Sequence, residues 1–230
     1  MLRKIESDIF NLVKDCYDNV PQHLPNLIIS DIKKADDEWD FSTSWAFKVA
    51  RIFGLETKTF VSRIVDEAYL KENFFGKISL AEDGYINIHL EDSWINKQII
   101  ILSANFKLEK SCVIYKKNLG DNDFLISYCY SKICRMLKSY ELLEKTTSVI
   151  NKDNRNIAIN ILQLLGPCNE KIERKMLERL AKAFYLYDSH LDWSSLTDKR
   201  IVDANAVLYK ACGFAIKSFM NKLEILDADY

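Results

Sequence analysis

The clearest chemical pattern in the sequence is a row of basic side chains between residues 170 and 187, where helical spacing predicts a single helix. At about 100° per residue, five cations fall within about 140° of one another, opposite an apolar face that includes Leu180 and Phe184. The five are Lys171, Arg174, Lys175, Arg179 and Lys182. Such a row is suited to track a phosphate backbone, whereas the flanking Glu170 and Glu178 favour a simple solvated outer face.

Two smaller groups combine aromatic with polar side chains on one face of an element. Tyr128, Lys132 and Arg135 recur at i, i+4 and i+7, which places them on one face of a predicted helix. Tyr85 and Asn87 alternate with isoleucines, which places them on one face of a predicted strand. Burial in the core is the alternative for Tyr128. For the strand, the alternative is that Tyr85 packs over a helix and Asn87 merely faces solvent.

No arrangement of residues suggests catalysis. The sequence has no glycine-rich phosphate loop, no C-x-x-C pair, and three histidines that stand far apart from one another. The sequence offers no catalytic arrangement of the Ser/His/Asp or Cys/His type. The acidic cluster formed by residues 36–38 and Asp40 matches no known spacing of metal ligands. The six scattered cysteines are expected to be small buried hydrophobes. We therefore expect no enzyme activity, no cofactor and no metal.

The composition is that of an ordinary soluble globular protein. Its 230 residues are 48% hydrophobic and 28% charged, and only 6 glycines and 3 prolines occur, which argues against an all-β architecture. No apolar run is long enough to cross a membrane and the first residues form no apolar signal segment, so we expect a cytoplasmic protein with no membrane partner. The net charge of −1 gives no overall basic footprint, although net charge is a poor guide to local patches.

The first half of the chain mixes predicted helices and strands. Helical periodicity predicts four helices, in residues 1–18, 42–53, 57–69 and 94–106. Gly54 is expected to end the second of them, and Phe47 is counted with its apolar face. Residues 27–30 are a short β-rich run and residues 31–40 read as a loop. Two further strands are predicted in residues 77–80 and 85–90, joined by a turn.

The second half of the chain is predicted to be helical throughout. From residue 124 to the end the pattern is interrupted only near residues 152–154, 166–167 and 194–197. We therefore predict an α+β protein in two parts. A small α+β domain occupies residues 1–106, a linker follows in residues 107–120, and an all-α bundle occupies residues 121–230.

The first half resembles the N-terminal additional domain of arginyl-tRNA synthetases. That family has a G-D-[YF]-[AS]-T-like stretch that opens a helix, and residues 39–43 read W-D-F-S-T, followed by Ala46. After a second helix the family has a strand of the type G-[FY]-I-N, and residues 84–90 read G-Y-I-N-I-H-L. The resemblance implies that Tyr85 and Asn87 contact a nucleotide in the D-loop of a tRNA, the ring by stacking on the base and the amide by reading its edge.

The second half resembles the helical anticodon-binding domain of the same family, which is the DALR type of the class I synthetases. That domain begins with a Y-x-x-Y-x-[HY]-x-R-[IL] helix, and residues 125–134 read L-I-S-Y-C-Y-S-K-I-C. Residues 180–184 read L-A-K-A-F, like its L-A-x-A-F helix, and residues 208–225 align with its closing segment. The order and spacing of these motifs carry the resemblance more than any single motif does.

This resemblance implies which residues of the second domain contact RNA. Tyr128 matches a family tyrosine near the anticodon loop, and Lys132 stands where the family usually has arginine. The terminal Tyr230 matches a residue close to the anticodon, although two nearby aspartates would repel phosphate. Leu125 replaces a second tyrosine and residues 187–188 (Y-D) replace a Phe-Tyr pair. These departures argue against an unchanged reading of an arginine anticodon.

The catalytic core of a class I synthetase has no counterpart in the sequence. His-x-Gly-His-like and Lys-Met-Ser-Lys-like motifs are missing, and residues 107–120 are too few for a nucleotide-binding fold built from βα units of about thirty residues each. The resemblance therefore implies a non-catalytic protein that binds an arginine-type tRNA as an adaptor and presents it to a tRNA-modifying or aminoacyl-tRNA-using enzyme. The alternative is a protein-interaction module on a synthetase-derived scaffold that has lost RNA binding, which the near-neutral charge favours.

Overall fold

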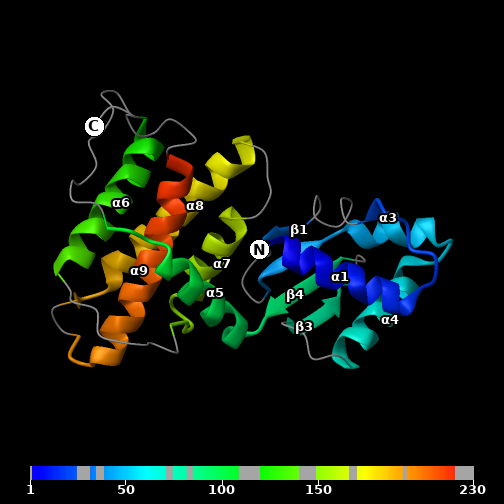
Figure 1. Ribbon diagram of the computed structural model, residues 1–230. Coiled ribbons are helices and arrows are strands. Elements are labelled where there is room, and N and C mark those ends of the chain that lie inside the picture. The colour runs from blue at the N-terminus through cyan, green and yellow to red at the C-terminus, as the bar shows by residue number, and fades with distance from the viewer. Residues whose placement is uncertain are drawn as a thin grey trace. The chain divides into compact units, whose positions relative to one another are not determined.

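The protein is described by a computed structural model that covers residues 2–24, 32–34, 39–70, 75–81, 85–108, 120–139, 149–165, 170–193 and 196–220. The chain divides into two compact units, Met1–Trp94 and Ile95–Tyr230 (Figure 1). The described part of the first unit contains a small β-sheet with helices, and that of the second unit is helical. The predicted α+β class, with a helical second part, is therefore confirmed.

Four short strands of the first unit form one antiparallel sheet in the order β1-β2-β4-β3. The strands are β1 (Ile32–Lys34), β2 (Phe41–Thr43), β3 (Phe75–Leu80) and β4 (Ile86–Leu90). Within the sheet, Ile88 of β4 pairs with Phe41 of β2 and with Ile78 of β3, and all three side chains are buried. Asn87 and His89, on the other face of β4, are only half-buried. The alternation predicted for this strand is confirmed.

The sheet is larger than the sequence predicted. Strand β1 lies in the segment 31–40 that reads as a loop, and β2 occupies the beginning of the helix predicted from residue 42. Strands of three residues are too short to display an alternating pattern, and β2 is held by its pairing with β4, which is distant in sequence. The β-rich run predicted at residues 27–30 lies outside the described residues.

Helices of the first unit pack together through α4. The helices described there are α1 (Leu2–Cys16), α3 (Trp45–Ile52) and α4 (Thr57–Leu70), and α4 contacts α1, α3 and β3. In the core, the rings of Trp45 and Phe60 meet edge to face with centroids 5.9 Å apart. Helix α3 ends at Ile52, and Gly54, which was expected to end this helix, lies just beyond it with a left-handed φ of 65°. The N–H of Leu55 donates to the carbonyl of Ala50, which closes the last turn.

Asp40 joins β2 to β4. Its carboxylate accepts a hydrogen bond from the N–H of Leu90 at 2.7 Å, and its own N–H donates to the carbonyl of Ile88 at 3.0 Å. The side chain is buried, and His89 Nδ1 lies 3.6 Å from Asp40 Oδ2. A buried carboxylate is stable only with partners of this kind, so Asp40 has a structural role. The other members of its predicted acidic cluster, residues 36–38, lie outside the described residues.

Four helices make up most of the described part of the second unit. They are α6 (Asp121–Ser139), α7 (Arg155–Leu164), α8 (Glu170–His190) and α9 (Lys199–Met220). Helices α8 and α9 each contact the other three, which gives the predicted bundle. The break predicted near residues 152–154 is a turn that precedes α7, whereas those near 166–167 and 194–197 fall wholly or partly outside the described residues.

Helix α5 (Asp92–Ala104) crosses the division, but most of its residues belong to the second unit. The side-chain oxygen of Asn96 accepts hydrogen bonds from the N–H groups of Val149 and Ile150, at 2.6 and 2.8 Å. Phe106, just beyond the helix, lies against Gly213 of α9. These contacts explain why the second unit begins earlier along the chain than the boundary at residue 106 that the sequence suggests.

Close packing between Phe106 and α9 depends on a residue without a side chain. A Cβ atom at Gly213 would lie 2.8 Å from Phe106 Cε2 and 3.1 Å from Ile133 Cγ2. Carbon atoms that are not bonded prefer separations of about 3.5–4.0 Å. Both neighbours are buried, so neither ring nor methyl group has free space into which it can move.

We predict that Gly213→Val lowers the free energy of unfolding by about 2 kcal/mol, because the added branches must displace Phe106 and Ile133. Denaturant unfolding followed by circular dichroism measures the change. Ser218→Val, at an exposed position of the same helix, is the matched control and is expected to change stability by no more than about 0.5 kcal/mol. Equal stability of the two variants would contradict the packing described.

Candidate nucleic-acid interface

The described residues offer no metal site and no reactive thiol. They hold no group of three or more His, Cys, Asp or Glu that could bind a metal ion. The cysteines described are buried, as predicted, and none of them is in a disulfide: Cys16, Cys129, Cys134 and Cys212. Burial, with the nearby Asp188 carboxylate, raises the pKa of the Cys129 thiol to about 12, so it stays protonated at neutral pH. None of the described helices is long and apolar enough to span a membrane.

Tyr85 and Asn87 lie on the less buried face of β4 and the residue before it, as the sequence predicted. The Tyr85 side chain is 39% exposed, and its ring meets the ring of Phe47 from α3 edge to face, with centroids 5.9 Å apart. Asn87 is half-buried and pairs with Ser42 of β2 and Ser79 of β3. Tyr85 therefore packs on a neighbouring helix and still presents part of its ring to solvent, and its contact with a nucleotide stays a prediction.

Phe47 belongs to this surface, although the sequence assigned it to the apolar face of the helix. Its side chain is 41% exposed, whereas the buried residues of α3 are Trp45, Ala46, Val49 and Ala50. That buried set follows an i, i+1, i+4, i+5 pattern, which leaves position 47 on the opposite side of the helix. The spacing of the other apolar residues of α3 could therefore have shown from the sequence that Phe47 is exposed. An exposed phenylalanine beside an exposed tyrosine is suited to stacking with an unpaired base.

A cation completes this face of the sheet. Lys77 of β3 pairs in register with His89 of β4, one step along from the Ser79–Asn87 pair, so these side chains share a face. The Lys77 ammonium lies 4.7 Å from the centroid of the Trp39 ring, and Lys77 remains exposed. Lys77 could not be recognised as a candidate from the sequence, because its position opposite His89 depends on the register of the hairpin.

On α6, Tyr128 lies beside an aromatic residue that the sequence analysis missed. Its ring meets that of Tyr185 from α8, with centroids 6.1 Å apart and planes at 64°. Tyr128 is half-buried and Tyr185 is 45% exposed. The alternative of a fully buried core position for Tyr128 is therefore wrong. Arg135, two turns further along α6, is exposed.

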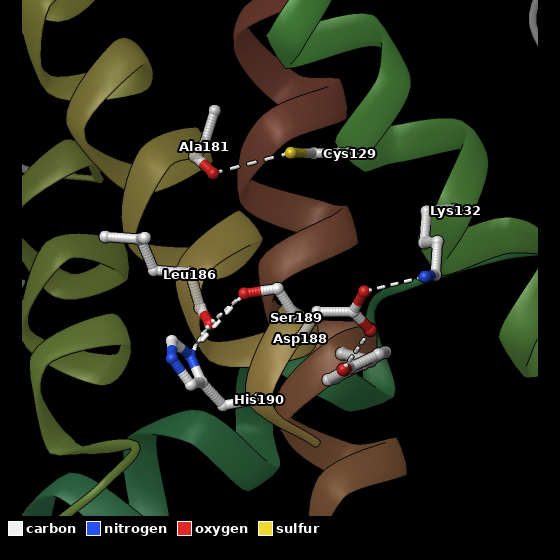
Figure 2. Close-up of polar contacts among 8 residues, drawn as sticks. Cys129, Lys132, Ala181, Leu186, Asp188, Ser189 and His190 are labelled. Carbon is white, nitrogen blue, oxygen red and sulfur yellow. Dashed lines mark hydrogen bonds and ion pairs between the residues drawn. The ribbon is translucent and has the colours of Figure 1, made fainter. Parts of the chain in front are cut away.

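Lys132 of α6 forms an ion pair with a residue of α8. Its ammonium lies 2.8 Å from the carboxylate of Asp188 on α8, which is buried and also accepts a hydrogen bond from the Tyr209 hydroxyl of α9 at 2.7 Å. Figure 2 shows the contact from Lys132 to Asp188 across the two helices. Hydrogen bonding to Asp188 raises the pKa of Lys132, while burial and Asp188 raise the pKa of Tyr209. Lys132 therefore does not present a free charge to phosphate.

The same network explains the Y-D pair at residues 187–188. Asp188 ties α8 to α6 and α9, and the hydroxyl of Tyr187 donates a hydrogen bond to the side chain of Asn205 on α9. Both side chains are thus committed to contacts between helices rather than to a surface for ligands. The two residues therefore serve the packing of this bundle.

Three of the five cations predicted in a row on α8 are exposed and form no ion pair with a described residue: Lys175, Arg179 and Lys182. They fall within about 60° of one another around the helix. Arg174 instead pairs with Asp123 of α6 at 2.7 Å. Lys171 lies in α8 but its side chain is outside the described part, as is the whole of Tyr230.

Comparison with known proteins relates the first unit to a known domain family. Residues 3–90 match the family model described as the arginyl tRNA synthetase N terminal domain. The chain is also similar to the crystal structure of arginyl-tRNA synthetase from Plasmodium falciparum, with 14% identity and a TM-score of 0.36, over 98% of this chain and 45% of that one. The chain thus spans less than half the length of that synthetase, and no curated protein matches it. By this match, residues 3–90 are related to the N-terminal domain of arginyl-tRNA synthetases.

We predict that Asp188→Ala lowers the free energy of unfolding by about 2–3 kcal/mol, because the buried Tyr209 hydroxyl loses this acceptor and Lys132 loses its partner. Tyr209→Phe removes only the donor and should cost about 1 kcal/mol. In the double variant the two losses should overlap rather than add. Denaturant unfolding of the four proteins tests this, and strictly additive losses would show that the pair does not interact.

Proposed function

We propose that this protein binds tRNA of the arginine type without acting on it, and presents the tRNA to a tRNA-modifying or aminoacyl-tRNA-using enzyme. The observation that carries the proposal is the match of residues 3–90 to the arginyl-tRNA synthetase N-terminal domain, with Tyr85 exposed at the head of β4 inside that match. In this proposal the first unit contacts the elbow of the tRNA and the second unit contacts the anticodon arm.

The chemistry of the first surface supports this proposal. Tyr85 and Phe47 supply ring surface on which an unpaired base can stack, Asn87 supplies an amide that can pair with the edge of a base, and Lys77 supplies a charge for phosphate. Stacking tolerates many bases, while the amide adds selectivity. The four side chains come from β4 and the residue before it, from β3 and from α3, all within one compact unit.

A non-catalytic role is proposed from the sequence. Chemistry on a tRNA by a class I synthetase requires ATP, and the motifs that hold ATP in that family have no counterpart between the two halves of this chain.

A protein-interaction module remains the second candidate, and one observation favours it. The first unit exposes several large apolar side chains in or near α3: Phe47, Ile52, Leu55 and Tyr85. Exposed apolar side chains that touch one another, as Phe47 and Tyr85 do, are typical of protein-binding surfaces. In addition, Lys132 and Arg174 are neutralised by carboxylates, which reduces the charge available for RNA.

We predict that the purified protein binds total tRNA, prefers an arginine isoacceptor, and loses affinity linearly on a logarithmic scale as salt rises. Tyr85→Ala should weaken binding about tenfold, the effect of losing one stacked base. Titrations at two salt concentrations measure both effects. Ile101→Ala, which removes an exposed apolar side chain from α5, is the control and should bind like the parent protein.

Failure to bind any tRNA at low ionic strength would overturn this function. The protein-interaction module would then become the leading candidate. Capture of a protein partner that is lost in a Phe47→Ala variant would support it directly.

A further inference from the structure

Two aliphatic side chains at the end of α3 are left in water. Ile52, the last residue of the helix, is 43% exposed, and Leu55, three residues further along, is 36% exposed. Both belong to the compact first unit, whose core buries other aliphatic side chains almost completely. Apolar surface in contact with water is unfavourable, and neighbouring exposed apolar side chains are typical of a surface that another protein covers.

An aromatic cluster fixes the segment that carries these two residues. The ring of Phe53, which stands between them in the sequence, has its centroid 5.0 Å from that of Tyr17 and 5.8 Å from that of Phe60. The turn that follows α3 is closed by the N–H of Leu55, which donates to the carbonyl of Ala50 at 2.9 Å. A surface fixed in advance loses little conformational entropy when a partner binds.

Positive charge is concentrated on the same helix face. Lys48 and Arg51, both exposed, lie between Phe47 and Ile52 around α3. Residues 44–63 as a whole hold four lysines and arginines against a single glutamate, whereas the full chain holds 32 cations against 33 carboxylates. The outer face of α3 therefore combines exposed aliphatic groups with a local excess of cations, which is complementary to an acidic, partly apolar partner.

Two other occupants fit this face poorly. RNA phosphates would use the cations but leave Ile52 and Leu55 in water, because aliphatic side chains offer no ring on which a base can stack. A second copy of the chain, docked symmetrically through the same face, would bring Lys48 and Arg51 against their own counterparts, and like charges repel. A protein segment that carries both apolar and acidic side chains satisfies the aliphatic and the cationic part of the face together.

We infer that the outer face of α3, from Lys48 to Leu55, docks a short acidic amphipathic helix of another protein. The eight residues of α3 span about 12 Å, so the partner segment is about two to three turns long. Its apolar side chains cover Ile52 and Leu55, and its carboxylates face Lys48 and Arg51. The proposed function, on which the identity of the partner rests, assigns this segment to the enzyme that receives the tRNA. A contact of this size is smaller than a standard interface and is weak by itself.

The test uses the full-length protein and a synthetic helical peptide of about 16 residues, with leucines along one face and glutamates beside them. Fluorescence anisotropy of the labelled peptide follows binding at protein concentrations up to about 0.5 mM, the range of weak interfaces. Ile52→Ala combined with Leu55→Ala should weaken binding about tenfold, because less apolar area is buried against the peptide. A peptide with lysines in place of the glutamates should bind the parent at least about tenfold more weakly, and Arg51→Glu should reduce this preference.

Ile101→Ala combined with Leu108→Ala is the matched control. These substitutions remove an isoleucine and a leucine that are 49% and 41% exposed elsewhere in the chain, and the peptide should bind as it does to the parent. The variant changed at Ile52 and Leu55 should keep its affinity for tRNA, whereas Tyr85→Ala should keep its affinity for the peptide. Circular dichroism checks that each variant is folded, as expected for changes at exposed positions.

No binding of the acidic peptide by the parent, or equal binding by the variant changed at Ile52 and Leu55, would overturn the docking face. If that variant loses tRNA as strongly as it loses the peptide, the face belongs to RNA and the inference fails. A parent dimer in light scattering that dissociates in the same variant would make a second copy the occupant and would also refute it. Peptide binding by a protein that binds no tRNA would keep the docking face and remove the proposed function alone.

Discussion

A buried carboxylate must find hydrogen-bond donors or a cation, and each unit of this protein is organised around one that does. In the first unit Asp40 accepts the N–H of Leu90 and so joins β2 to the end of β4. In the second unit Asp188 binds Lys132 of α6 and Tyr209 of α9. Neither carboxylate can be removed without leaving a buried polar group short of a partner.

These two carboxylates also decide which side chains are left for a ligand. By holding β4 in the sheet, Asp40 fixes the strand that Tyr85 precedes, and α3 places Phe47 against it. Asp188 fixes α6 against α8, where Tyr128 meets Tyr185, and in doing so it neutralises Lys132. The proposed surfaces therefore follow from core contacts, and rigid backbones beneath exposed rings are what a stacking site requires.

Long elements of the fold could be predicted from the sequence because each carries its own periodic pattern. The helices α4, α5 and α8 repeat apolar residues over several turns, and β4 alternates clearly. The strands β1 and β2 could not be predicted, since three residues show no period and their stability comes from partners elsewhere in the chain. Local pattern carries no information about pairing at long range.

The same limit applies to the candidate surfaces. Tyr85, Asn87 and Tyr128 could be named as candidates because their types and spacing are local features. The sequence could not show that Lys132 is neutralised, because its partner Asp188 lies on another helix. The same holds for the pair of Arg174 and Asp123, which are 51 residues apart. Tyr185 was missed because neither its own helical pattern nor the family pattern marks it, and only its contact with Tyr128 does.

Charge distribution, more than net charge, bears on whether the second unit binds RNA. A net charge of −1 is compatible with a local row of cations, because positive and negative side chains need not be evenly distributed over the surface. A short row of cations offers only a few phosphate contacts, which in physiological salt gives weak and unselective binding. Stacked bases add affinity that salt does not screen. A chain with one such surface in each unit would bind RNA more tightly than either surface alone, because binding at the first surface raises the effective concentration of the same RNA at the second.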